Sequence, residues 1–409
     1  MQYRRWVLDL FESALKTRRV LILAGPRQCG KTTLARSLSI KDARYLTLDD
    51  QALLTAALHD PQAFVKHGNE LMVIDEVQKA PLLLPAIKKI VDENTAPGQY
   101  LLTGSANIQT APGVTESLAG RIHTMRLHTL AEGEIAGKPL RFLEEAFSQA
   151  FSTAVQTPVL ERDQIIEMAL RGGFPEPLHF SEKDRRSWHK DYIKALIERD
   201  LKDIVKIRNQ SAMYALFDVL AAWSSKFMDL SSIGTGLSIQ RPTLESYINA
   251  VEAFYLIEKV QPWSKTDYAR VGKQSKFFMA DSGLMASLLK WRMQDIRLNP
   301  DRVGKLVETF VFNQLIAQIH ASVEEYTLYH YRDREKREID FLVERIDGSL
   351  LGIEVKASSS ISMEDFKHLI WFKDNLIKQG NFIGIVLYAG AHVLSFGSQL
   401  WAVPIGCLC

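Results

Sequence analysis

The sequence has few of the features that mark secreted, disulfide-bonded or membrane proteins. It contains three cysteines in 409 residues, Cys29, Cys407 and Cys409, and their spacing fits neither a disulfide framework nor a set of metal ligands. No stretch reaches the roughly 18 uncharged apolar residues of a membrane span. The stretch MQYRRWVLDLFESALKTRR scatters charges among its apolar residues, which favours an amphipathic helix over a signal peptide. These absences predict a cytoplasmic protein with reduced thiols.

An excess of charge of one sign is also missing. The 50 Lys and Arg residues nearly balance the 48 Asp and Glu residues, which gives a formal net charge of +2 at pH 7. Nucleic-acid binding would therefore depend on local basic patches and not on the charge of the whole chain. Hydrophobic residues make up 46% of the sequence, enough for several ordinary cores, and the length predicts two to four domains.

A glycine-bounded loop follows the first apolar stretch. Val20–Ala24 has the composition of a buried parallel strand, and the next residues place glycine, lysine and threonine in the spacing G-x-x-x-x-G-K-T. In such a loop, backbone N–H groups converge on phosphate oxygens at the start of a helix. We expect Lys31 to reach the β- and γ-phosphates of ATP and Thr32 to hold Mg²⁺. The predicted nucleotide-binding residues of the loop are Gly25, Pro26, Arg27, Gln28, Cys29, Gly30, Lys31, Thr32 and Thr33.

Two later apolar stretches also end in polar residues. LMVIDEVQK, residues 71–79, brings Asp75 and Glu76 to the end of a short strand. An aspartate at this position binds Mg²⁺ in P-loop ATPases, and we expect Glu76 to polarise the attacking water. QYLLTGSAN, residues 99–107, supplies Thr103 or Ser105 to sense the γ-phosphate. Strands that alternate with helices and end in such loops predict a doubly wound parallel α/β sheet.

These elements, together with ESLAGR at residues 116–121, resemble the AAA+ class of P-loop ATPases. The resemblance implies Mg²⁺-dependent ATP hydrolysis and a ring-like homo-oligomer, with a hexamer as the first expectation. It also implies an arginine that reaches the nucleotide of a neighbouring subunit. Arg121 is the candidate for this catalytic role, and an ordinary solvated charge is the alternative.

The middle of the chain is rich in predicted helices. Residues 156–225, interrupted at RGGFPEP, resemble the helical lid that follows an AAA+ core. The stretch LSSIGTGLSIQRPTLESYINAV then gives a short helix, a glycine turn and a longer helix, as in a helix-turn-helix. In the longer helix, helical spacing turns Leu244, Tyr247, Ile248 and Val251 toward the core. The predicted outward residues are Arg241, Thr243, Glu245 and Asn249. A winged helix at this position would bind DNA or serve as a packing module.

A second set of charged residues occurs in the C-terminal third. A predicted helix carries Glu308, and two predicted strands carry Asp340 and the pair Glu354 and Lys356. Period-two alternation puts Glu354 and Lys356 on one face. If the three carboxylates meet, they would share a second Mg²⁺ or Mn²⁺. Lys356 would then orient a water or stabilise charge on a phosphate. Solvated charges on a hairpin are the alternative.

The length of one turn decides whether this metal site exists. A two-residue turn at Asp347 and Gly348 would direct Asp340 and Glu354 to opposite faces of the sheet. A three-residue loop from Ile346, with Gly348 in the left-handed conformation, would instead place the two carboxylates opposite each other. Directly opposed Cβ atoms lie about 4.5–5.5 Å apart, which is close enough to share a cation.

The pattern resembles the PD-(D/E)xK nuclease fold, with Ile339 where the motif usually has proline. This resemblance implies either a nuclease or a domain that keeps the fold for binding only. Over nearly its whole length the chain resembles a prokaryotic family that joins an AAA+ ATPase, a winged helix and such a C-terminal domain of unknown function. The stretches that carry this resemblance include GGFPEP, ERDL and FFMADSGL.

The sequence therefore predicts an α/β multidomain protein. The expected parts are an AAA+ P-loop ATPase core in residues 1–155, a helical lid in 156–225, a winged helix-turn-helix in 226–290 and a nuclease-like domain in 291–409. One hypothesis is an ATPase that remodels or processes DNA, including branched DNA, with the basic run YRDREKR at residues 331–337 as a contact. The other is a nucleotide-operated oligomeric switch whose C-terminal domain binds protein and does not cut DNA.

Overall fold

The computed structural model describes residues 3–37, 43–104, 120–151, 160–201, 210–266, 274–377 and 381–409. The chain divides into two compact units. The first unit comprises residues 1–129 and Glu252–Leu256, and the second comprises Leu130–Val251 and Ile257–Cys409. Apart from Glu252–Leu256, the predicted lid, helix-turn-helix and C-terminal segments fall together in the second unit, and their finer boundaries remain predictions. No helix in the described part of the chain is long and apolar enough to cross a membrane.

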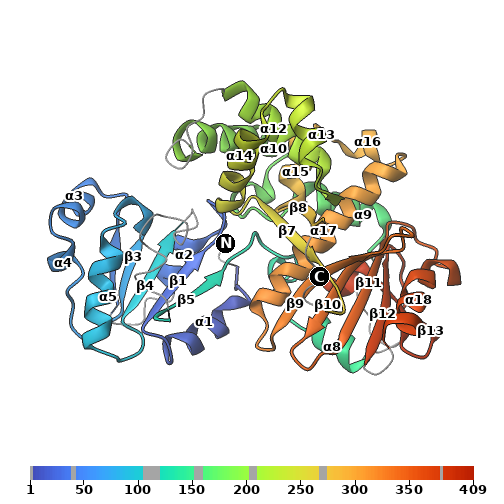
Figure 1. Cartoon of the computed structure of the whole chain (residues 1–409), viewed down its shortest axis with the longest axis horizontal. Helices are drawn as coiled ribbons and strands as arrows, with labels where there is room; N and C mark the ends of the chain where they lie inside the picture. The colour runs from blue at the N-terminus through green and yellow to red at the C-terminus, as the bar shows by residue number, and fades with distance from the viewer. Residues whose placement is uncertain are drawn as a thin grey trace. The chain divides into compact units, whose positions relative to one another are not determined.

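The first unit is built on a parallel five-stranded sheet (Figure 1). The strand order is β2-β3-β4-β1-β5, and every neighbouring pair is parallel. The strands are β1 (Val20–Ala24), β2 (Arg44–Thr47), β3 (Met72–Asp75), β4 (Tyr100–Gly104) and β5 (Ile122–Arg126). The helices are α1 (Val7–Leu15), α2 (Lys31–Ser37), α3 (Gln51–His59), α4 (Pro61–Phe64) and α5 (Leu83–Glu93). The predicted parallel α/β core is confirmed.

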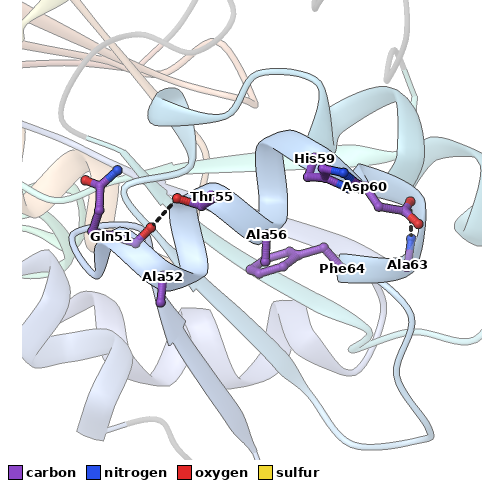
Figure 2. A pocket seen from close by; sticks show the side chains of 8 residues that line it. All are labelled: Gln51, Ala52, Thr55, Ala56, His59, Asp60, Ala63 and Phe64. Atoms are coloured by element: carbon purple, nitrogen blue, oxygen red, sulfur yellow. Dashed lines mark hydrogen bonds between the residues drawn. The ribbon is translucent and has the colours of Figure 1, made fainter.

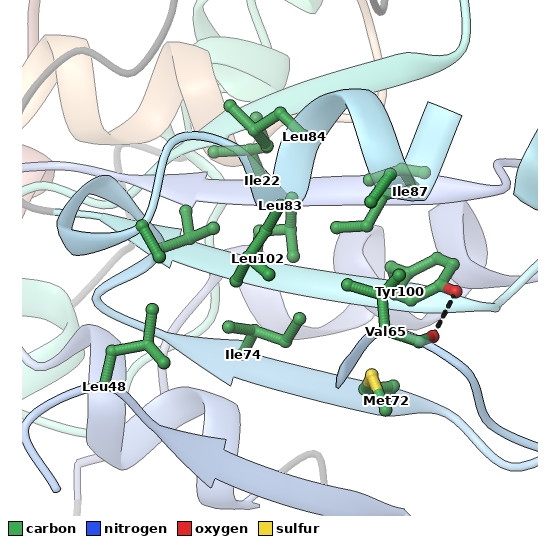
Figure 3. Packing of buried hydrophobic residues seen from close by; sticks show 14 of the residues in the cluster. Ile22, Leu48, Val65, Met72, Ile74, Leu83, Leu84, Ile87, Tyr100 and Leu102 are labelled. Atoms are coloured by element: carbon green, nitrogen blue, oxygen red, sulfur yellow. Dashed lines mark hydrogen bonds between the residues drawn. The ribbon is translucent and has the colours of Figure 1, made fainter. Parts of the chain in front are cut away.

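Burial on both sides explains why these strands are short and almost wholly apolar. All residues of β1, β3 and β4 are buried. Figure 3 shows Leu83, Leu84 and Ile87 of α5 packed near Ile22 of β1 and Leu102 of β4. At the edge of this core the Tyr100 hydroxyl donates a hydrogen bond to Val65 O at 2.8 Å, which satisfies a buried polar group (Figure 3). The carboxyl ends of the strands are thereby fixed in position.

The second unit contains a mixed sheet of nine strands (Figure 1). Its order is β13-β14-β12-β11-β10-β9-β7-β8-β6. The strands are β6 (Lys226–Phe227), β7 (Ile257–Pro262), β8 (Lys276–Met279), β9 (Tyr326–Arg332), β10 (Glu338–Arg345), β11 (Leu350–Lys356), β12 (Phe382–Tyr388), β13 (Leu394–Gly397) and β14 (Leu400–Pro404). Because β7 pairs with β9, the strands of the predicted winged segment and of the C-terminal segment form one continuous sheet.

The helices of the second unit include one long helix that lies against the sheet. They are α7 (Glu132–Ile135), α8 (Phe142–Ser148), α9 (Arg162–Arg171), α10 (Glu182–Ala195), α12 (Gln210–Trp223), α13 (Leu230–Leu237), α14 (Arg241–Ala253), α15 (Ser282–Leu288), α16 (Met293–Ile296), α17 (Pro300–Ala321) and α18 (Lys367–Leu376). Phe312 of α17 stacks on Phe278 of β8 and lies near Phe341 of β10. Leu369 and Phe372 of α18 belong to a separate apolar cluster with strand residues. The sheet is thus covered by α17 and α18 through different side chains.

Two of the stretches singled out in the sequence pack directly on each other. Asp281, which begins α15, accepts hydrogen bonds from the backbone N–H groups of Leu284 and Gly173 at 2.8 and 2.7 Å. A Cβ on Gly172 would lie 2.3 Å from Asp281 Oδ1 and 2.9 Å from Gly283 Cα. GGFPEP and FFMADSGL therefore pack against each other through their glycines and the buried carboxylate of Asp281. The role of these residues is structural.

Gly172→Ala should destabilise the second unit. Gly172 has φ +69°, and the added methyl group would collide with the backbone of Gly283. Gly172 combines φ +69° with ψ −170°, a conformation that costs a non-glycine residue about 1–3 kcal/mol, and overpacking adds about 1–3 kcal/mol. Gly137→Ala is the control, because Gly137 has a similar φ of +67° with no heavy atom within 4 Å of the added Cβ. Thermal unfolding should show a clearly larger loss for Gly172→Ala, and equal losses would contradict the packing role.

Candidate active site

The glycine-bounded loop joins β1 to α2 at the carboxyl edge of the parallel sheet. A Cβ on Gly25 would lie 2.1 Å from the carbonyl oxygen of Leu127, so only glycine fits where the loop passes the end of β5. Gly30 has φ +104°, a conformation that favours glycine. The predicted strand, loop and helix are present, and the backbone needs both glycines.

Lys31 is enclosed by the loop. Its side chain is buried, and Nζ donates hydrogen bonds to the carbonyl oxygens of Gly25 and Pro26 at 3.0 and 2.8 Å. These contacts hold the ammonium on the side where the loop backbone turns. The positive charge therefore lies where the phosphates of a nucleotide cradled by residues 25–32 would need it.

Asp75 of β3 accepts hydrogen bonds from two neighbouring strands and from the helix that follows the loop. It is 2% exposed. Thr32 Oγ1 and the Tyr45 hydroxyl donate to Asp75 Oδ2 at 3.0 and 2.6 Å, and Thr103 Oγ1 donates to Oδ1. The hydroxyl of Thr32 and the carboxylate of Asp75 are hard oxygen ligands of the kind Mg²⁺ prefers. The residues present therefore fit a Mg²⁺ ion that accompanies the nucleotide.

Tyr45 is a member of this site that the motifs do not mark. Burial, together with the hydrogen bond to Asp75, raises the pKa of Tyr45 to about 12, so its phenol remains a donor at neutral pH. Its contact depends on the pairing of β2 with β3, which places Thr47 beside Asp75. Sequence periodicity does not define the register between β2 and β3, so it does not predict the contact of Tyr45 with Asp75. The only sequence signal for this contact is the position of Tyr45 in the strand next to β3.

Glu76 follows β3 directly and has a left-handed backbone, with φ 59°. Its backbone N–H donates to Thr103 Oγ1 at 3.2 Å, and its side chain accepts a hydrogen bond from Gln78 Nε2. Thr103, one of the two predicted sensors, thus contacts both acidic residues. Ser105, the other candidate, lies outside the described residues.

Arg5 lies outside the nucleotide loop and holds it through hydrogen bonds to backbone carbonyl groups. It is 8% exposed, and its guanidinium donates to Cys29 O at 2.9 Å and to His128 O at 2.7 Å. No motif marks this residue, because its two partners are distant in the sequence. Arg5 therefore positions the nucleotide loop relative to the segment that follows β5.

Arg5→Ala should weaken ATP binding about tenfold, because hydrogen bonds to charged groups contribute about 1.5–3 kcal/mol and two loop-side carbonyls lose their donor. Arg4→Ala is the control, because the Arg4 side chain is 74% exposed and pairs with Asp9 at the surface. Isothermal titration with MgATP measures both. Equal affinities for the two variants would contradict a positioning role.

The C-terminal hairpin has the register that joins the predicted carboxylates. Phe341 pairs with Ile353, so one step further along the hairpin brings Asp340 opposite Glu354. The loop is the three-residue one, and Gly348 has φ +80°. A bulge between Ile339 and Leu342 of β10 adds a residue beside Asp340, a common means of redirecting a side chain. Of the two turns that the sequence left open, the structure has the one that places Asp340 and Glu354 opposite each other.

An unexpected lysine lies among these carboxylates. Lys276 of β8 is 1% exposed, and its Nζ lies 2.6 Å from Glu308, 2.8 Å from Glu338 and 3.1 Å from Asp340. Within the described ranges, no three His, Cys, Asp or Glu side chains are arranged to hold a metal ion. The predicted residues Glu308 and Asp340 come together, but they do so around an ammonium group.

The electrostatics of this cluster follow from burial and crowding. Burial opposes the charge on Lys276, but the carboxylates of Glu308, Asp340 and Glu338 outweigh it and raise the pKa of Lys276 well above its usual value. Burial, and then the adjacent Asp340, raise the pKa of Glu354 well above that of an ordinary carboxyl. Lys356 lies at the rim, where its side chain is 37% exposed and 3.8 Å from Asp365. Lys356 therefore does not neutralise the buried carboxylates through an ion pair with them.

Comparison with known proteins covers the first of these two sites. Residues 17–136 match a family model described as an AAA domain. The part of the chain that holds the glycine-bounded loop and Asp75 is therefore similar to AAA domains. Residues 162–295 and 303–408 match two domains of unknown function, DUF8612 and DUF4143. Those two matches leave the predicted winged helix and nuclease-like fold as proposals.

Two curated relatives match the chain over most of its length, and both are described as uncharacterized proteins. Over 98% of its length the chain is 28% identical to the uncharacterized protein Rv2008c of Mycobacterium tuberculosis and to Mb2031c of Mycobacterium bovis, covering 83% of each. Among solved structures, it is similar to the RuvB Holliday junction branch migration motor of Thermotoga maritima, with 16% identity, 62% of this chain and 88% of that one covered, and a TM-score of 0.29. It is also similar to the clamp loader delta protein of Bacillus subtilis, with 10% identity, coverage of 77% and 98%, and a TM-score of 0.26.

Within the ATPase core, Arg121 lies far along the sheet from the nucleotide loop. It directly precedes β5, whose first residue, Ile122, pairs with Val20 at the start of β1, whereas the loop follows the other end of β1. Arg121 forms an ion pair with Asp92, the residue before the last of α5. Its predicted catalytic contact with ATP would therefore have to be made with another subunit.

The predicted helix-turn-helix has the expected burial pattern. Four residues of α14 that the spacing predicts to be inward are buried, namely Leu244, Tyr247, Ile248 and Val251. Arg241, Thr243 and Asn249 are exposed, and Arg241 pairs with Glu245 at 2.9 Å. β7 and β8 are antiparallel, and β6 pairs with β8. The basic stretch KTDYARVGKQSK, residues 265–276, would form a wing, and its residues 267–273 lie outside the described residues.

The basic run at residues 331–337 is largely engaged within the second unit. Arg337 pairs with Asp333 at 2.6 Å and lies over the ring of Trp371 at 3.6 Å. Arg332 lies over Phe227 at 4.4 Å. These contacts favour packing over an open basic groove for Arg332 and Arg337.

A groove elsewhere in the first unit is separate from the chemistry. It has a volume of about 890 Å³ and lies along α3 and α4 (Figure 2). Its lining is mostly small or apolar, with Ala52, Ala56 and Phe64 prominent. No residue of the nucleotide loop lines it, so it is not the ATP site.

Proposed function

We propose that this chain is a Mg²⁺-dependent ATPase whose catalytic centre lies at the carboxyl edge of the five-stranded sheet. The observation that carries the proposal is the buried Asp75 carboxylate, which Thr32, Tyr45 and Thr103 hold beside the enclosed ammonium of Lys31. Phosphoryl transfer is catalysed mainly by positioning and by electrostatic stabilisation, and these groups supply both.

Each residue has a defined task in this proposal. Lys31 exchanges its loop carbonyl partners for the β- and γ-phosphate oxygens. Thr32 and Asp75 hold the Mg²⁺ of the MgATP substrate, which offsets the negative charge that develops on the phosphates. Glu76, at the end of β3, orients the water and accepts its proton. Thr103 links Asp75 and Glu76, so it relates the metal side of the site to the water side.

Release of phosphate from ATP by the purified chain tests this proposal. Hydrolysis is expected with Mg²⁺ and should stop when EDTA removes the metal. A chain that binds ATP but releases no phosphate under any metal condition would be a nucleotide-binding switch without turnover. Hydrolysis that survives complete chelation would contradict the assigned role of Thr32 and Asp75.

The proposed assembly is a ring-like homo-oligomer, a hexamer first, in which Arg121 acts on the nucleotide of a neighbour. Support comes from the position of Arg121 just before β5. This is the end of the sheet away from the nucleotide loop of the same chain. Arg121→Ala should lower turnover while ATP affinity stays nearly intact. Asp92→Ala is the matched control, because it breaks the same ion pair and keeps the guanidinium.

Mixing subunits tests whether Arg121 acts between chains. Lys31→Ala subunits cannot use ATP but still carry Arg121, so adding them to Arg121→Ala subunits should restore hydrolysis above the sum of the two separate rates. Rates that merely add would show that each subunit works alone.

DNA, including branched DNA, is the proposed partner of the second unit. The exposed face of α14 beside the β6, β7 and β8 strands supports it, although Glu245 offsets the charge of Arg241. Added DNA should increase ATP turnover, and the increase should fall steeply with salt because phosphate contacts release counterions. If neither linear nor branched DNA changes the rate at low salt, the protein-binding switch is the better account. The C-terminal domain is proposed to bind without cutting, for the reason given next.

A further inference from the structure

Lys276 occupies the centre that the sequence predicts for a second metal ion. It lies on β8, in the predicted wing, whereas its partners lie on α17 and β10. Its side chain is 2% exposed, and three carboxylates approach the ammonium within 3.1 Å. An ammonium has three N–H donors. Lys276 donates hydrogen bonds to Glu338 and Asp340, and it forms an ion pair with Glu308 at 2.6 Å. The desolvation of a buried ion is offset only by partners arranged in this way.

The oxygens of Asp340 and Glu338 already face other groups. Asp340 Oδ1 faces Lys276 at 3.1 Å, and Asp340 Oδ2 accepts a hydrogen bond from the backbone N–H of Val355 at 3.0 Å. Glu338 contacts Lys276 with one oxygen, and its other oxygen lies 3.9 Å from Arg332. With Lys276 in place, the residues present do not fit a divalent cation, which would also meet the repulsion of the ammonium.

Removal of the lysine would change this balance. Glu354 is 8% exposed, and its Oε1 has no hydrogen-bond partner among the described residues. Together with the oxygens of Glu308 and Asp340 that Lys276 now engages, it would give a set of hard oxygen ligands suited to Mg²⁺ or Mn²⁺. The cluster therefore has the carboxylates of a metal site, but its cation is the ammonium of Lys276.

We propose that Lys276 is the resident cation of this cluster and replaces the divalent metal at the nuclease-like site. Its ammonium ties the wing strand β8 to α17 and β10, and it keeps the C-terminal domain free of bound Mg²⁺ or Mn²⁺. The domain consequently binds its partner without hydrolysing phosphodiester bonds. This inference concerns the second unit alone, so loss of ATP hydrolysis and failure of this inference are separate results.

Titration with Mn²⁺, followed by electron paramagnetic resonance in the absence of nucleotide, tests the inference. The wild type and Asp340→Asn should give superimposable titrations, because no Mn²⁺ binds at the cluster in either. Lys276→Gln should bind one additional Mn²⁺ per chain, and the double variant Lys276→Gln with Glu354→Gln should lose it. Lys265→Gln, which removes an exposed lysine of the same unit, should match the wild type.

The thermal midpoint gives a second readout. Mn²⁺ should raise the midpoint of Lys276→Gln, because a ligand that binds only the folded state stabilises it, and should leave the cluster of the wild type unaffected. A Mn²⁺ ion that the wild type binds and Asp340→Asn does not would overturn the inference, and so would a folded Lys276→Gln with no added affinity. If Lys276→Gln does not fold, the comparison of the wild type with Asp340→Asn decides the question alone.

Discussion

Lys31→Ala should abolish ATP binding by the full chain. The ammonium of Lys31 is held inside the nucleotide loop by Gly25 and Pro26, where it faces the site of the β- and γ-phosphates. Charge-assisted hydrogen bonds to phosphate are worth about 1.5–3 kcal/mol each, so the affinity for MgATP should fall at least about 100-fold.

Isothermal titration with MgATP measures this change. Lys89→Ala is the control, because Lys89 is an exposed lysine of α5 in the same unit and should bind ATP normally when replaced. A Lys31→Ala protein that stays folded and binds ATP as the wild type does would place the nucleotide elsewhere in the molecule.

Glu76→Gln should separate binding from hydrolysis. Glu76 ends β3 next to Asp75, and glutamine keeps its size and its contact with Gln78 but cannot accept a proton from water. General bases contribute about 10²–10⁴-fold to a rate, so turnover should fall about 100-fold or more while ATP affinity stays close to that of the wild type.

Phosphate release at saturating ATP measures the second effect. Glu93→Gln, at the exposed end of α5, is the matched control and should keep full activity. Equal turnover in Glu76→Gln and the wild type would falsify the role of Glu76 as the base.

The structural features that the sequence predicts correctly depend on residues that are close together in the chain. Gly25, Gly30 and Lys31 stand at fixed spacing within one loop, and the apolar run of β1 fixes that loop at a strand end. Short-range geometry was sufficient for this loop. The hairpin register, in contrast, stayed open between a two-residue and a three-residue turn until the structure showed the three-residue loop.

The missed residues depend on contacts between distant segments. Arg5 reaches His128 across 123 positions, and Lys276 reaches Glu338 and Asp340 across more than 60. A single lysine in a strand carries no mark of burial, since lysine is ordinarily exposed. The prediction of a second metal ion was therefore made without this lysine. The carboxylates were correctly grouped, but the chain supplies its own cation from a strand assigned to another domain.

The predicted domain boundaries divide the chain into more parts than the two compact units of the structure. Periodicity separated a helix-turn-helix from the C-terminal segment, and each element is present. The pairing of β7 with β9, from Gln261 to Tyr329, joins their strands into one sheet. Such a pairing is set by long-range packing, which residue patterns along one segment do not encode.

The most direct test of the ATP site at the carboxyl edge of the five-stranded sheet is hydrogen exchange measured by mass spectrometry. It compares the protein with and without a slowly hydrolysed ATP analogue and Mg²⁺. The account predicts slowed exchange in peptides that cover residues 25–33 and 72–76, because backbone N–H groups of the loop would bind phosphate oxygens. Saturating binding of the analogue with unchanged exchange in those peptides would contradict the central claim.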